Sequence, residues 1–132
     1  MRTILTALLL TASVPALAQT KKTAVYFHCT CDDTSGAALA SAIRDDLAIS
    51  PRYEEVSASK TVTYQLRMVT MDGGQLNEGY STVYSAVVTF GPNSDDQPDV
   101  YAGHAVGMCG RNRVSSCAGN IIAFLDGLIH GN

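Results

Sequence analysis

Four cysteines are the residues of this chain best suited to chemistry, and they come in two closely spaced pairs. Cys29 and Cys31 are separated by one residue, whereas Cys109 and Cys117 lie further apart along the chain. Cysteine sulfur can form a disulfide, bind a soft metal ion or exchange disulfides with other thiols. An even number of cysteines in a protein outside the cytoplasm first indicates disulfides, and four cysteines allow three connectivities.

A local and a long-range pairing of these cysteines compete. Cys109 ends a predicted strand and Cys117 lies in the first turns of a predicted helix, so a strand-to-helix connection brings them close. We therefore predict a Cys109–Cys117 disulfide, which stabilises by about 2–3 kcal/mol on the chain-entropy model. Cys29 and Cys31 are then a strained Cys-x-Cys pair or free thiols. The alternative joins Cys29 and Cys31 each to one distant cysteine, tying the first strand to the last helix.

The same residues suggest a metal site as the alternative function. His28, Cys29 and Cys31, together with His104, offer ligands for copper or zinc. Successive residues of a strand point to opposite faces, however, so His28 points away from both cysteines. The spacing matches none of the usual zinc patterns, and no Cys-x-x-Cys opens a helix as in thiol oxidoreductases. We predict no metal and no cofactor, and keep a metal-binding or thiol-redox protein as the alternative.

No pattern typical of a hydrolase is present in the sequence. A nucleophile–histidine–acid site needs His28, His104 or His130, of which the first two fall within predicted strands. His130 is two residues from the end of the sequence. No Gly-x-Ser-x-Gly elbow occurs. We therefore predict that the protein is not an enzyme.

The first residues, MRTILTALLLTASVPALAQ, have the layout of a secretory signal peptide. Arg2 precedes an apolar run, and Ala16-Leu17-Ala18 supplies the small residues that a signal peptidase reads. The run is too short to cross a hydrocarbon core, which takes roughly 20 residues. We predict that residues 1–18 are removed by cleavage near Ala18, leaving a single domain, residues 19–132. That domain is expected in the periplasm or outside the cell.

The charge of the predicted mature chain argues against two kinds of partner. Without Arg2, the chain contains eight Lys and Arg residues and twelve Asp and Glu residues, which give a formal net charge of −4. Nucleic acid is bound through clustered basic residues, and anionic lipid surfaces also attract basic segments. We therefore predict no nucleic-acid partner. Because no later segment is apolar enough to cross a bilayer, we also predict no membrane span.

The hydrophobic pattern predicts the element order β-α-β-β-β-β-α. The predicted strands are residues 23–30, 53–56, 61–71, 80–90 and 100–108, and the predicted helices are residues 36–49 and 114–129. Both helices carry an apolar stripe, which in the second runs from Val114 to Ile129 at the i, i+3, i+4, i+7 spacing. The first crossover makes the strand before it parallel to the short strand after it. The later strands are expected to form an antiparallel meander.

The strand predicted at residues 61–71 has one apolar face and one polar face. Val62, Tyr64, Leu66 and Met68 alternate with Thr61, Thr63, Gln65 and Arg67. This period of two is typical of a sheet with one buried and one wet face. Because the long strands then offer one strongly apolar face, both helices are expected on that face. The fold class predicted is α+β, a two-layer sandwich with a mostly antiparallel sheet.

One segment resembles a recurring module of bacterial envelope proteins. The residues LAISPRYEEV, from Leu47 to Val56, are similar to a helix end and following strand in the amino-terminal domain of TolB and in the curli-secretion protein CsgG. A further strand that starts a hairpin follows in that module, and residues 60–71 would be that strand here. The resemblance covers residues 36–71 and implies an α+β fold and an envelope setting. It implies no catalytic residues.

These observations favour a non-enzymatic binding or accessory module that interacts with another envelope or secreted protein. An inhibitor or immunity protein that neutralises a toxin is one specific form of this function. The aromatic side chains of the predicted strand 80–90 are candidates for a recognition patch, and strand edges can accept a partner strand.

Overall fold

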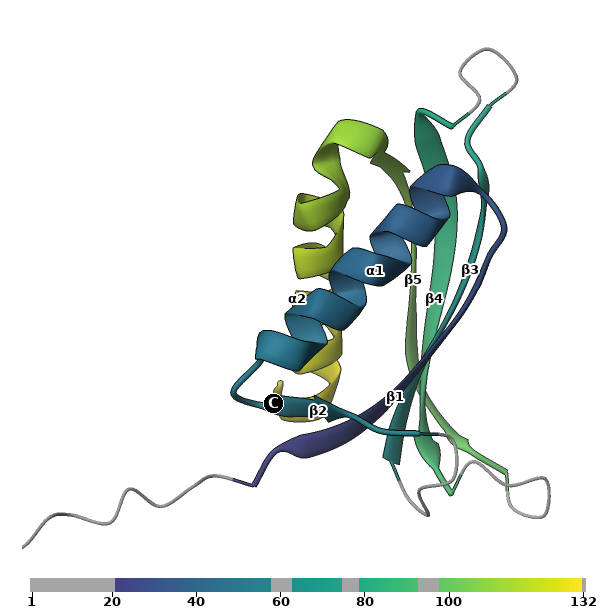
Figure 1. Cartoon of the computed structure of the whole chain (residues 1–132). Coiled ribbons are helices and arrows are strands. Elements are labelled where there is room, and N and C mark those ends of the chain that lie inside the picture. The colour runs from purple at the N-terminus through teal and green to yellow at the C-terminus, as the bar shows by residue number, and fades with distance from the viewer. Residues whose placement is uncertain (1–20, 58–62, 75–78, 93–97, 132) are drawn as a thin grey trace, which may run out of the picture.

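The computed structural model describes residues 21–57, 63–74, 79–92 and 98–131 of the 132-residue chain. It contains five strands and two α-helices in the order β1-α1-β2-β3-β4-β5-α2, with a short 3₁₀ helix before α2 (Figure 1). The strands are β1 Thr23–Cys31, β2 Tyr53–Glu55, β3 Thr63–Asp72, β4 Ser81–Gly91 and β5 Val100–Gly110. The helices are α1 Thr34–Ile49 and α2 Val114–His130. The predicted signal peptide, residues 1–18, lies outside the described residues.

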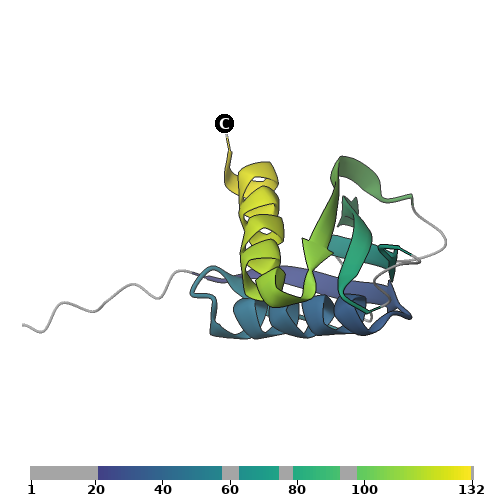
Figure 2. The same cartoon turned by 90° about the horizontal axis from the view of Figure 1, so that it is seen from above.

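All five strands form one sheet, and both helices cover the same face of it (Figures 1 and 2). The strand order is β2-β1-β3-β4-β5. β1 is parallel to β2 and also to β3, while β3, β4 and β5 form an antiparallel meander. The predicted two-layer α+β sandwich is confirmed, including the parallel pairing across the first crossover. What the sequence did not indicate is that β1 inserts between β2 and β3.

Helix α1 begins two residues before its predicted start because Asp33 caps it. The Asp33 carboxylate accepts hydrogen bonds from the Gly36 N–H, at 2.8 Å, and from the Thr70 hydroxyl of β3, at 2.6 Å. Burial opposes the charge, but these hydrogen bonds hold the pKa of Asp33 below its ordinary value. A side chain at Gly36 would collide with Thr70 and Asp33, so glycine lets the helix approach β3 closely. The cap therefore joins the first turn of α1 to the sheet.

The core lies between the helices and the sheet. Its fully buried members include Leu39 and Ile43 of α1, Leu66 of β3 and Leu125 of α2. The predicted stripe of α1 is buried in full, and Ala118, Ile121 and Leu125 form the buried centre of the predicted stripe of α2. The two helices also pack against each other. Burial of these apolar stripes is the main favourable contribution to the fold.

Strand β5 is longer than predicted and changes register near its start. It runs to Gly110, and a shift in its pairing with β4 lies between Val88 and Thr89. Gly103 follows this irregularity, and its missing side chain leaves room for Leu128 of α2. A glycine inside a strand commonly accompanies a bulge or a close approach of another segment, and both features occur here.

Candidate functional site

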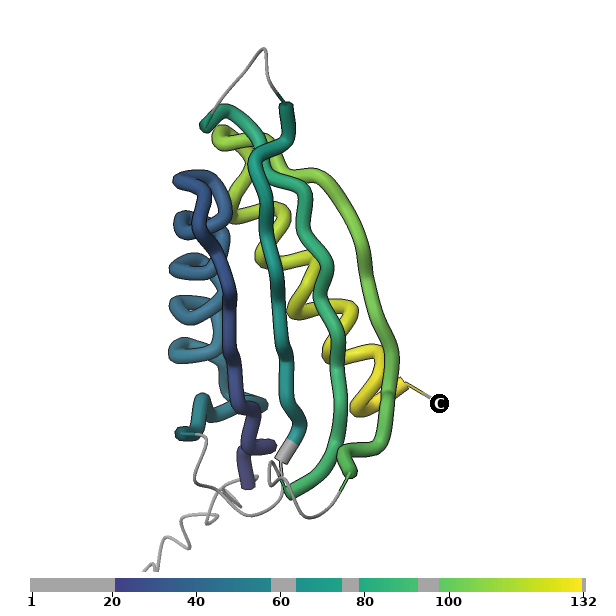
Figure 3. The backbone as a smooth tube through the Cα atoms, turned by 90° about the vertical axis from the view of Figure 1, so that its right-hand side faces the viewer, coloured from purple at the N-terminus to yellow at the C-terminus, as the bar shows by residue number. Residues whose placement is uncertain are grey.

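The face of the sheet turned away from the helices is open. Figure 3 views the molecule from this side, with the strands in front and both helices behind them. No described element lies over this face, which we call the open face. Register pairs align the strands so that side chains of β1, β3, β4 and β5 form rows across it.

One end of the open face is apolar and exposed. Met71, Val83 and Met108 lie in one row, and Val69 and Val106 lie in the next. Met71 is 64% exposed, Val106 66%, Met108 65% and Val69 53%. A shallow groove of about 100 Å³ opens among Val69, Met71, Val83 and Val106. We call Val69, Met71, Val83, Val106 and Met108 the apolar end. Large contiguous apolar patches are uncommon on monomers and mark interaction sites.

The opposite end of the open face is polar and hydrogen-bonded. The Arg67 guanidinium donates to the Gln65 side-chain oxygen at 2.7 and 3.1 Å, and the Gln65 amide donates to Asp99 at 2.8 Å. Thr89 of β4 also donates to Asp99. Gln65, predicted to face water, is instead fully buried. The reason is that Asp99, which precedes β5, reaches over this end of the face and pairs with it.

The candidate ligands of the alternative metal site are not brought together. His28 is exposed on the open face, whereas Cys29 and Cys31 pack against the core on the helix side. His104 also lies on the open face, in the same row as His28, but β3 and β4 separate them. Three strand spacings place them about 14 Å apart. Among the described residues, no group of three His, Cys, Asp or Glu side chains is positioned to hold a metal ion.

The structure joins the cysteines as two local pairs. Cys109, at the end of β5, is bonded to Cys117 in the second turn of α2, with Cα atoms 6.1 Å apart. Cys29 is bonded to Cys31 within β1, with Cα atoms 5.4 Å apart. Cys109 is fully buried. This connectivity is the local pairing. The long-range alternative, in which cysteines link β1 to α2, is not the one in the structure.

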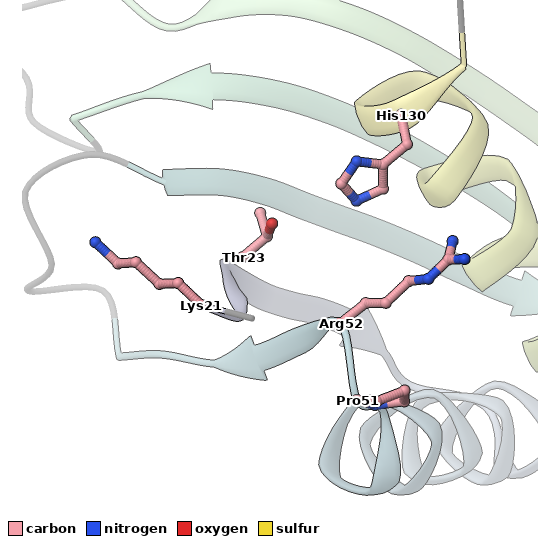
Figure 4. Close-up of a pocket in the computed structure, with 5 residues that line it drawn as sticks. All are labelled: Lys21, Thr23, Pro51, Arg52 and His130. Carbon is pink, nitrogen blue, oxygen red and sulfur yellow. The ribbon is translucent and has the colours of Figure 1, made fainter. Parts of the chain in front are cut away.

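A second concave site lies where β1, β2 and the end of α2 meet. The pocket has a volume of about 380 Å³ and is lined by Lys21, Thr23, Pro51, Arg52 and His130 (Figure 4). Figure 4 shows the Lys21 and Arg52 side chains extending in different directions, so their charges do not converge on one point. Arg52 is moreover paired with Asp126. The pocket therefore lacks a concentrated positive charge to bind an anion.

Asp126 connects α2 to the turn before β2. Its carboxylate accepts hydrogen bonds from the Arg52 guanidinium at 2.7 and 2.8 Å and from the Tyr53 hydroxyl at 2.6 Å. The Tyr53 and Arg52 hydrogen bonds lower the pKa of Asp126. Burial and the neighbouring carboxylate raise the pKa of Tyr53 well above its usual range. Asp126 is therefore a structural link that is stable while its carboxylate is ionised.

This link predicts a pH-dependent stability. A carboxyl group whose pKa is lowered by folding stabilises the protein above its unfolded pKa, near 3.8, and this contribution is lost as pH falls through the lower folded pKa. We expect Asp126→Asn to lower the melting temperature at neutral pH, and to lower it less at an acidic pH well below 3.8. Thermal melts followed by circular dichroism test this, with the exposed Asp45→Asn as the control. A difference that is equal at both pH values would contradict it.

The sequence contained a signal for the apolar end that the prediction did not use. Residues 69 and 71 are valine and methionine, so the polar face predicted for β3 becomes apolar in its second half. The hairpin aromatics, which were candidates for a recognition patch, lie outside the apolar end, although Tyr80 is 66% and Phe90 41% exposed. Tyr84 packs against the core on the helix side, and the Phe90 ring packs at a tilt against Tyr64, with ring centres 4.8 Å apart.

The fold and the open face define a disulfide-bonded α+β sandwich with one sheet face that no described element covers. No protein-family model matches the chain, and no curated protein sequence matches it. The chain is similar in structure to the hypothetical protein CT253 from Chlamydia trachomatis, with 10% identity and a TM-score of 0.49 over 85% of this chain and 100% of that one. It is also similar to uncharacterized lipoprotein B from Nitrosomonas europaea, with 10% identity and a TM-score of 0.39 over 91% and 95%. Both TM-scores are below 0.5, and neither likeness supports a conclusion about function.

None of the helices among the described residues is long and apolar enough to cross a lipid bilayer.

Proposed function

We propose that this protein is a non-enzymatic binding module that acts outside the cytoplasm and holds another envelope protein against its open face. The observation that carries the proposal is the apolar end, where four large side chains are more than half exposed on a face that no described element covers. The groove there is suited to one apolar side chain of a partner, with Val69, Met71, Val83 and Val106 as its walls. Burial of such an anchor contributes strongly to protein–protein affinity.

Two further features support this function. Both cysteine pairs are joined as disulfides, which persist in oxidising compartments such as the periplasm and are rare in the cytosol. The polar network at the other end of the open face leaves a hydrophilic margin beside the apolar end, as in protein interfaces with an apolar centre and a polar rim. The segment from Leu47 to Val56 resembles modules of bacterial envelope proteins, and this interpretation of the sequence also favours a location in the envelope.

Photo-crosslinking in the living host tests the proposal. A photoreactive phenylalanine derivative replaces Met71 on the open face, and in the control it replaces Asp45, which is exposed on α1. We expect the probe at position 71 to yield one dominant adduct with a second protein, and the probe at position 45 to yield none. Adding Val69→Asp to the position-71 probe is expected to remove the adduct, because a charge in the groove opposes burial of an apolar anchor.

Any of the following outcomes would count against the proposal. These are the absence of an adduct at position 71, equal adducts from both positions, and an adduct unaffected by Val69→Asp. Mass spectrometry of the adduct identifies its second component, and an adduct composed of this chain alone would also contradict a different envelope protein as the partner.

A further inference from the structure

The two edges of the sheet differ in how they are protected. β2, at one edge, is only three residues long, and Glu54 and Glu55 make it negatively charged. β5, at the other edge, has eleven residues and contains no Asp, Glu, Lys, Arg or Pro. Natural proteins commonly protect sheet edges with short strands, charges or proline, because an open edge can pair with another chain. Among the described residues, the β2 edge has this protection and the β5 edge does not.

The hydrogen-bonding groups of β5 that face outward can be assigned from its pairing with β4. The Arg111 N–H donates to the Tyr80 carbonyl oxygen at 2.7 Å, directly beyond the register pair of Gly110 with Ser81. Hydrogen-bonded and non-hydrogen-bonded pairs alternate in an antiparallel ladder. From Gly103 to Gly110, the even-numbered residues of β5 therefore direct their N–H and C=O groups to the free edge. The side chains of the same residues lie on the open face and are exposed, namely His104, Val106 and Met108.

We propose that two copies of this chain associate through the free edges of β5, antiparallel about a two-fold axis at Val106. Val106 then lies opposite Val106 of the second copy, and His104 lies opposite its Met108. Each of these pairs can exchange both of its main-chain hydrogen bonds, which is how added strands gain affinity. The two sheets become one continuous sheet, and the two apolar ends meet at the axis.

The absence of charge within β5 favours a second copy as the occupant of this edge. Exposed Arg111 and Arg113 follow the carboxyl end of β5. Antiparallel pairing places the basic ends of the two copies at opposite ends of the joined strands, so they do not repel each other. The strand itself is uncharged, so self-pairing opposes no like charges, while Glu54 and Glu55 lie at the far edge of the sheet. This separation of like charges favours the antiparallel direction of association.

The dimer goes beyond the proposed function, and either can fail without the other. The β5 edge determines the dimer, whereas the groove beside Val69 and Met71 determines capture of a different protein. Val69 lies on β3, two strands away from the free edge. Val69→Asp is therefore the matched control, because it places the same charge on the same face without touching the β5 edge.

Sedimentation velocity of the exported, purified protein tests the dimer from micromolar to millimolar concentration. We expect wild type and Val69→Asp to form dimers. Val106→Asp and Val106→Lys are each expected to weaken dimerisation by about tenfold or more, because they set like charges against each other at the axis. A mixture of Val106→Asp and Val106→Lys should restore a one-to-one dimer, a result that misfolding of either variant cannot give.

Hydrogen exchange provides an independent measurement on the wild-type protein. The amide protons of His104, Val106 and Met108 should become protected as the concentration rises, because they then donate to the second copy. A monomer at all concentrations, or a dimer that Val106→Asp leaves intact, would overturn the proposal. A dimer lost equally with Val69→Asp and Val106→Asp would place the contact on the open face and overturn pairing at the edge.

Discussion

Leu66→Ala is expected to lower the free energy of unfolding by about 3 kcal/mol, within the 2–5 kcal/mol typical of such buried truncations. Leu66 is fully buried at the middle of β3, the central strand of the sheet, on the face that the helices cover. The substitution removes apolar contacts and leaves a cavity that the packed sheet and helices fill only in part. A domain of this size has a total stability of about 5–15 kcal/mol, so the loss is a large share of it. Urea unfolding followed by circular dichroism measures the change.

Val69→Ala on the same strand is the matched control for Leu66→Ala. Val69 points to the open face and is 53% exposed, so its truncation should change stability by no more than about 0.5 kcal/mol. The pair of variants therefore tests which face of β3 is the core. Equal losses for the two substitutions would mean that the open face is covered in the native protein.

Removal of the Cys109–Cys117 disulfide is the second change with a large expected effect. The bridge closes a loop of eight positions from the end of β5 into α2. Replacing both cysteines by alanine is expected to cost about 2–3 kcal/mol of stability, because the unfolded chain gains the freedom that the loop closure removed. The measurement is the urea midpoint of the double variant compared with wild type under oxidising conditions.

The second disulfide supplies the control for the first. Cys29 and Cys31 close a loop with a separation of two, and on the same model a shorter loop constrains the unfolded chain less. Replacing this pair should therefore cost less than replacing Cys109 and Cys117. A free-thiol count on the unreduced protein, expected to be zero, checks both bridges. Larger destabilisation from the Cys29 and Cys31 pair, or two free thiols per chain, would contradict this assignment.

Much of the fold could be predicted from local patterns. The helical stripes containing Leu39 and Ile121 repeat at the spacing that places residues on one helix face, and β3 alternates around Leu66. These patterns determine which side of each element is apolar, and short connections then limit which elements can be neighbours. The boundaries were less accurate where a side chain from another element contributes, as with the Thr70 hydroxyl at the cap of α1.

The candidate site was much harder to predict than the fold. Alternation identifies two faces of a strand, but it does not say which apolar face will be covered. Val69 and Met71 continue an apolar pattern that is equally consistent with a second buried layer, and only the position of both helices on the other face leaves them exposed. Gln65 shows the reverse case, since Asp99 buries a residue that the pattern predicted to be wet.

By itself, the sequence determined the order of the elements, the apolar stripes of the helices and the close spacing of the cysteine pairs, because these depend on residues near one another in the chain. Only the tertiary structure decided that β1 lies between β2 and β3, that one sheet face is open and that β5 is a free edge. The physical reason is that burial and edge pairing depend on what other segments cover. Contacts between residues that are distant in the sequence determine this, and the local periodicity of hydrophobic residues does not reveal such contacts.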